Sequence, residues 1–241
     1  MTISAVGSVA TSSGSTTLSV SPTTIGNILV VAIGTSGSDF LINSISGGGV
    51  TTWQLVNSGY NISGLGSRNG SYVYLGIITS TGSTTITLTP RTAGIIQGIA
   101  AQEFSESSAG GTWNWITVTN RSSSYKAFVA ESSVGAVTYS SGDYTNTDVV
   151  YPQSSGLVGY PTADSMFIAN GSFFYTPSGS TTGFTYTNYG TSNRSQFIYE
   201  TNLTPSSFYK PTWSTATAGR IATCASVVWY QPPSGPIVMI V

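Results

Sequence analysis

The chain has 241 residues, enough for one large β-domain or two small ones with a buried core. Charged residues make up only 6% of it, against a usual fraction of about 25%, and the formal net charge is -1. Nucleic acids and anionic membranes are bound through clustered Lys and Arg, so the composition argues against both partners. The absence of histidine excludes Ser-His-Asp and Cys-His catalytic pairs and every histidine metal site.

Strand signals dominate the first hundred residues. Residues 26–33 form a continuous β-branched run bounded by glycine, which predicts a central strand buried on both faces. Gly47-Gly48-Gly49 predicts a turn that no bulky residue could form. Other alternating or apolar runs predict strands over residues 16–20, 42–45, 52–56, 71–78, 84–89 and 95–104. Short strands with a turn signal every ten residues or so are typical of a sandwich.

The second half reads in the same way. Strands are predicted over residues 113–118, 166–175, 183–187, 196–201 and 220–230. Residues 143–161 form an insertion rich in Tyr, Asn, Gly and Pro. Because no window has a sustained helical period, the sequence predicts an all-β protein.

Three stretches recur in the same order and indicate an internal duplication. Residues 6–14 match residues 134–142 at six of nine positions. An apolar run follows each of them, at 26–33 in the first half and 164–169 in the second. A shared closing pattern comes last, at 93–104 and 218–229. We therefore expect a β-sandwich built from two similar halves. The predicted division is a first unit over 1–105, a connecting segment with a short strand over 106–133, a second unit over 134–231, and a Pro-rich turn with an apolar tail over 232–241. The two units are either separate sandwiches or parts of one continuous domain.

The end of the chain is apolar. After a Pro-rich stop come five apolar residues, which need cover from water. They either fold back on the protein or add as a strand to a neighbouring subunit, and the second alternative is preferred. The candidate subunit-docking residues are Ile237, Val238, Met239, Ile240 and Val241.

The order of these signals resembles a module of bacteriophage tail and virion-surface proteins, such as minor tail proteins. The matching pieces are residues 26–32, the 46–49 turn before 52–56, and the closing strand 100–105, with 164–169 and 225–230 in the second half. The resemblance implies a β-sandwich of jelly-roll type, often trimeric, with a structural or adhesive role in a phage particle. The 143–161 insertion and the apolar tail depart from the pattern.

Catalytic chemistry has little support in the sequence. A glycan-cleaving protein needs two acids at a defined separation, and no two of the eight acids stand in a recognisable motif. Glu103 lies in an apolar strand, where we expect it to pair with Arg220 or Arg91 or to face solvent at a strand edge. The single cysteine, Cys224, is expected to be a small buried hydrophobe. A calcium site at Asp143 and Asp148 has no support, because these residues do not stand in the usual calcium-loop pattern. Taken together, the sequence leads us to expect no catalytic residue, no metal site and no cofactor.

Aromatic residues in turn-rich segments are the better lead to a ligand. Tyr and Trp rings can stack on sugars while Asn and Ser bind the hydroxyls, although such rings also fill cores, sheet faces and subunit interfaces. The candidate glycan-contact residues are Tyr60, Trp113, Trp115, Tyr144, Tyr151, Tyr160, Tyr186 and Tyr189.

The sequence thus favours a structural protein on the surface of a bacteriophage virion, as a minor tail or capsid decoration subunit with weak contact to host glycans. The expected partners are other virion proteins, further copies of the chain (a trimer is favoured) and a cell-surface glycan. We expect synthesis in the host bacterial cytoplasm, because no secretory signal is visible. The alternatives are a carbohydrate-binding adhesin or receptor-binding protein and, least favoured, a polysaccharide-degrading enzyme.

Overall fold

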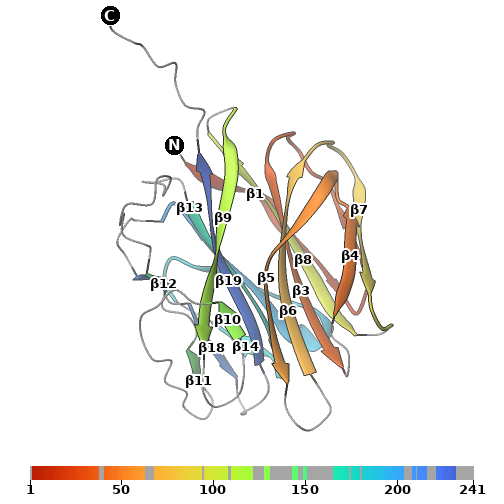
Figure 1. The fold of residues 1–241 in the computed structure, drawn as a ribbon, viewed down its shortest axis with the longest axis vertical. Helices are drawn as coiled ribbons and strands as arrows, with labels where there is room; N and C mark the ends of the chain where they lie inside the picture. Colours follow the sequence, from red (N-terminus) through yellow and green to blue (C-terminus); the bar gives the residue numbers. More distant parts are fainter. Residues whose placement is uncertain are drawn as a thin grey trace, which may run out of the picture.

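The computed structural model describes residues 2–37, 41–62, 68–93, 95–107, 110–121, 128–130, 143–145, 149–150, 165–173, 175–179, 181–203, 208–209, 211–215 and 221–231. The protein is an all-β sandwich of antiparallel sheets, which confirms the predicted fold class (Figure 1). In the part of the chain that is described, the only helical element is the short 3-10 turn η1 (Thr191–Asn193). That part holds no helix long and apolar enough to cross a membrane.

Three sheets form the body of the protein. Sheet A has the strand order β1-β8-β3-β6-β5, sheet B has β2-β7-β4, and sheet C has β10-β9-β19-β13-β16-β15. Two small sheets, β11-β18-β14 and β12-β17, complete the described strands. In sheets A and B the strands are β1 (Ile3–Ser13), β2 (Thr17–Val20), β3 (Ile28–Gly37), β4 (Ile42–Gly47), β5 (Val50–Ile62), β6 (Arg68–Ile78), β7 (Thr84–Pro90) and β8 (Ile96–Glu106). The others are β9 (Thr112–Arg121), β10 (Phe128–Ala130), β11 (Asp143–Thr145), β12 (Val149–Val150), β13 (Ser165–Phe173), β14 (Pro177–Ser178), β15 (Thr185–Tyr189), β16 (Ser195–Thr201), β17 (Phe208–Tyr209), β18 (Thr212–Thr215) and β19 (Ile221–Gln231).

Sheet A is the middle layer and is covered on both faces. Strand β3 shows why, because its first eight residues are all buried. Ile28 and Val30 pack into the core shared with sheet C, whereas Leu29 and Val31 pack into the core shared with sheet B. This alternation confirms the prediction of a central strand that is buried on both faces.

Sheets A and C are also joined by buried polar groups. Asn170 of β13 is fully buried, and its Nδ2 donates to the carbonyl oxygens of Ile33 and Tyr72 at 2.9 and 3.3 Å. Nearby, the hydroxyls of Ser172 and Ser195 lie 2.9 and 3.1 Å from Gln97 Oε1. Buried polar groups need such partners, so these contacts fix one relative position of the two sheets.

The fold requires glycine at two places, one a tight turn and the other a close approach of two sheets. Gly47, Gly48 and Gly49 all have φ between 72 and 78°, which makes the predicted turn from β4 to β5 specific to glycine. At Gly34 in β3, an added Cβ would lie 2.0 Å from Ser195 Oγ in sheet C. The absence of a side chain at Gly34 therefore lets the two sheets meet.

The order of strands in sheet A recurs in sheet C. The order β1-β8-β3-β6-β5 has the same pattern of crossovers as β9-β19-β13-β16-β15, and β2-β7-β4 has the same pattern as β11-β18-β14. This match puts β9 in the place of β1, whereas the sequence repeat matched residues 6–14, nearly all of them in β1, to residues 134–142. The strand expected to be short within residues 106–133 runs over ten residues as β9 and pairs with β19, the position that β1 holds beside β8. Residues 131–142, which contain the second copy of the first repeated stretch, lie outside the described residues.

Candidate functional site

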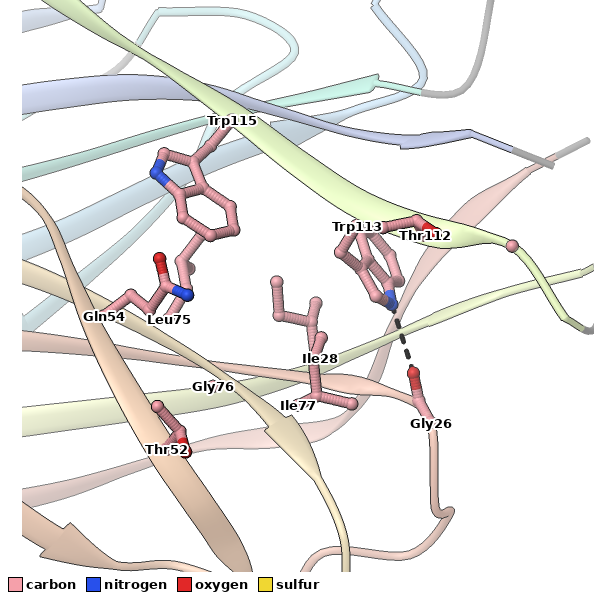
Figure 2. Close-up of a pocket in the computed structure, with 11 residues that line it drawn as sticks. Gly26, Ile28, Thr52, Gln54, Leu75, Gly76, Ile77, Thr112, Trp113 and Trp115 are labelled. Atoms are coloured by element: carbon pink, nitrogen blue, oxygen red, sulfur yellow. Dashed lines mark hydrogen bonds between the residues drawn. The ribbon is translucent and has the colours of Figure 1, made fainter. Parts of the chain in front are cut away.

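A pocket of about 280 Å³ opens where sheet C crosses the edge of sheet A, between β9 and strands β3, β5 and β6 (Figure 2). We call it the tryptophan pocket. It is lined by Gly26, Ile28, Thr52, Gln54, Leu75, Gly76, Ile77, Gly111, Thr112, Trp113 and Trp115. The strand alternation of β9 turns both tryptophans toward sheet A, and Figure 2 shows them above the β5 and β6 residues. The pocket volume lies just below the roughly 300–1,000 Å³ of typical small-molecule sites.

Trp113 is a fixed wall of the tryptophan pocket. Its side chain is only 6% exposed, and its Nε1 donates a hydrogen bond to the carbonyl oxygen of Gly26 at 3.1 Å. Its ring meets the ring of Tyr230 edge to face, with centroids 5.2 Å apart. The Tyr230 hydroxyl in turn accepts a hydrogen bond from the backbone N–H of Gly111. These contacts hold the indole in place before any ligand arrives.

Trp115 and the β5 residues supply the accessible surface. Trp115 is half-buried, while Thr52 and Gln54 are exposed. Figure 2 shows the Trp115 ring over Gln54 and Leu75, and Ile77 near the middle of the pocket. Ile77 is 41% exposed, which is high for an isoleucine in a sandwich. The site therefore offers apolar surface with a few neutral hydrogen-bonding groups at its rim.

None of the described residues that line the tryptophan pocket has an ionisable side chain. General acid–base or nucleophilic chemistry needs a titratable or activated group within reach of the ligand, and these lining residues supply none. Aromatic faces beside hydroxyl and amide groups suit a ligand that has both an apolar face and neutral polar edges.

The other predicted aromatic contacts are distributed differently. Tyr189 requires a correction: it is 2% exposed, and its hydroxyl donates to Asn170 Oδ1 at 2.8 Å inside the core between sheets A and C. It fills the core because β15 directs it inward, so it cannot meet a ligand at the surface. Tyr186 is half-buried and packs beside Phe184 on the opposite face of sheet C. Of the four predicted aromatic residues whose side chains are described, Trp113 and Trp115 line the tryptophan pocket.

Several predicted residues cannot be placed. Tyr60 and Tyr144 lie on β5 and β11, where the structure describes the backbone alone. Tyr151, Tyr160 and the docking residues 237–241 lie outside the described residues.

Glu103 has a structural role and does not face solvent, and Arg220, one of its two predicted arginine partners, lies outside the described residues. Glu103 is 5% exposed, and its carboxylate accepts hydrogen bonds from both Thr23 donors, the backbone N–H of Thr24 and Asn27 Nδ2. The carboxylate thus holds the loop between β2 and β3 against β8. Sequence could not reveal this, because the donors are about 80 residues away.

Cys224 is fully buried, as predicted. Burial raises the pKa of its thiol to about 12, and its Sγ lies 3.3 Å from Ser71 Oγ. A thiol that stays protonated is a poor nucleophile. Among the described residues, no group of three or more His, Cys, Asp or Glu side chains is placed to hold a metal ion.

Sequence reasoning missed the β5 side of the tryptophan pocket. The alternation over residues 51–56 places Thr52 and Gln54 on one face of a strand, but it does not say what that face meets. The site exists only because β9, some sixty residues later, packs across β5.

The fold gives the class of protein, an all-β sandwich. The sequence matches no family model, no curated protein and no solved structure, so its function has to be argued from the site.

Proposed function

We propose that the protein is a non-catalytic binding protein and that the tryptophan pocket holds a neutral sugar. The supporting observation is the joint presence of a fixed indole, a half-exposed indole and neutral hydrogen-bonding groups, with no charged side chain among the described lining residues. A sugar ring has an apolar face that can stack on Trp115. Its hydroxyl groups can bond Gln54 and Thr52, and its neutrality suits a lining without ions.

We also propose that the protein belongs to the surface of a bacteriophage virion, as a minor tail or capsid decoration subunit in a homo-oligomer, with a trimer favoured. The support is the resemblance of its motifs to phage surface modules and a charge content of only 6%. Two jelly-roll halves from an internal duplication are part of this proposal, and the repeated strand order is what such a duplication would produce. The sugar would then belong to the host surface.

Calorimetric titration with six-unit oligosaccharides tests the sugar proposal. The probes are neutral oligomers of glucose, mannose, galactose and N-acetylglucosamine, with oligogalacturonate as the anionic comparison. We expect at least one neutral probe to bind with a Kd between micromolar and millimolar. Trp115→Ala and, separately, Gln54→Ala should weaken that binding about tenfold and severalfold, respectively.

Asn114→Ala is the matched control. Asn114 lies between the two tryptophans on β9, does not line the pocket, and donates a hydrogen bond from Nδ2 to the nearby Thr112 carbonyl. Its replacement should leave binding unchanged. Binding of the anionic probe alone, no binding at millimolar concentration, or neutral binding that survives Trp115→Ala would overturn the proposal.

The second candidate function is purely structural, and the polar groups that join sheets A and C favour a rigid subunit. The two functions differ in what the purified protein binds. Saturable binding to whole host-type cells, competed by their polysaccharide, supports the sugar site. Binding only to particles that lack the protein, and only with residues 237–241 present, supports an assembly subunit.

A further inference from the structure

A second groove lies on the other side of strand β5. Because side chains alternate along a strand, Thr52 and Gln54 reach the tryptophan pocket on one face of β5. Thr51, Trp53 and Leu55 instead line a space of about 520 Å³ whose other wall is β4. We call this space the β4–β5 groove. A single edge strand of sheet A thus separates two hollows.

The β4–β5 groove has the same chemical character as the tryptophan pocket. Trp53 is half-buried, and its Nε1 donates to the carbonyl oxygen of Gly47 at 3.1 Å, as Trp113 does to Gly26. The glycine turn that ends β4 therefore fixes the indole. Ser44, Ser46 and Asn43 supply hydroxyl and amide groups, and none of the described residues that line the groove carries a charge.

The two hollows are neighbours along one edge of the molecule. Strand β5 contacts both β4 and β9, and Figure 1 shows it between them. Four large apolar side chains are exposed in the described part of the chain. Two of them line these hollows: Ile77 in the tryptophan pocket and Leu55, 50% exposed, in the β4–β5 groove. Exposed apolar residues that gather at one place mark an interaction surface.

We infer that the ligand is an extended neutral polysaccharide that crosses β5, with one sugar in the tryptophan pocket and a later sugar of the same chain in the β4–β5 groove. The inference rests on the proposed sugar function and extends it from one sugar to a polymer. A lone sugar can fill only one hollow. Two linked sugars raise each other's effective concentration, so a chain long enough to span both hollows binds more tightly than either part.

Chain length is the variable that tests this inference. The probes are one-, two-, four- and six-unit oligosaccharides of whichever neutral sugar binds, titrated into the intact protein. We expect affinity to rise about tenfold or more from the two-unit to the six-unit probe. Leu55→Asp should weaken the six-unit probe about fivefold and change the two-unit probe less than about twofold. Trp115→Ala should weaken both.

Tyr175→Asp is the matched control, because it also places a charge at an exposed apolar residue but touches neither hollow. It should leave every affinity unchanged. Equal affinity for the two-unit and six-unit probes would overturn the spanning ligand and leave the proposed sugar site intact. An unchanged affinity of Leu55→Asp for the six-unit probe would have the same meaning. Absence of binding by every probe overturns the proposed function itself.

Discussion

Replacing Asn170 with alanine should destabilise the whole protein, because this side chain joins sheets A and C at the centre of the core. The substitution removes the Nδ2 bonds to the carbonyls of Ile33 and Tyr72 and the bond from the Tyr189 hydroxyl to Oδ1. Each such bond contributes about 1 kcal/mol net, and a buried partner left unpaired costs about 1–3 kcal/mol. We expect the free energy of unfolding to fall by about 3–5 kcal/mol.

Urea unfolding followed by circular dichroism measures this change. The midpoint should fall while the slope stays constant, since the surface exposed on unfolding is the same. Asn114→Ala removes an exposed bond on β9 and should cost less than about 0.5 kcal/mol. A double-mutant cycle with Tyr189→Phe should give a coupling energy of about 1 kcal/mol. A loss below about 1 kcal/mol from Asn170→Ala, with additive effects in the cycle, would refute the reasoning.

Three further predictions concern buried contacts. The Cys224 thiol has an ordinary pKa near 9 and a folded pKa of about 12. The unfolded state therefore loses the thiol proton first, and the free energy of unfolding should fall as the pH rises between these two values. Cys224→Ala should reduce this fall in pH-dependent unfolding curves. Gly34→Ala places a methyl group against Ser195 and should lower the free energy of unfolding by about 2–3 kcal/mol in urea unfolding. The loss should be much smaller in a Ser195→Gly background, and an equal loss in both backgrounds would refute the clash. Glu103→Gln puts an amide among four donors and should cost about 1–3 kcal/mol by the same assay, whereas an unchanged midpoint would show that the carboxylate does not hold the loop.

Most of the long strands could be predicted from local sequence, although β1 was not, and the site could not be predicted. The apolar run over residues 26–33 and the three glycines at 47–49 specify their structures through burial and φ alone, so both were predicted. The burial of Tyr189 and the loop contacts of Glu103 were missed because their partners, Asn170 on β13 and the loop at Thr23, come from other parts of the fold. A tyrosine in a turn-rich segment looks accessible until the packing of sheet C on sheet A is known.

The two tryptophans of β9 show the same limit, because their strand could be predicted and the rest of their pocket could not. Two residues apart on a strand, they share one face, and both were named as candidate ligand contacts. The groups that complete the pocket lie on β3, β5 and β6, and only the long-range packing brings them together. Strand alternation thus predicts which residues share a face, and tertiary contacts decide whether that face becomes core, interface or pocket.

The central claim is that a neutral sugar binds between Trp113, Trp115 and Gln54. Nitrogen–proton NMR spectra of the labelled protein, with the indole signals assigned through single Trp→Phe variants, test it directly. On addition of a neutral six-unit oligosaccharide that binds, the indole signals of Trp113 and Trp115 and the side-chain amide of Gln54 should shift, while that of Trp229 stays in place. Shifts at Trp229 without shifts at Trp113, Trp115 and Gln54 would contradict the claim.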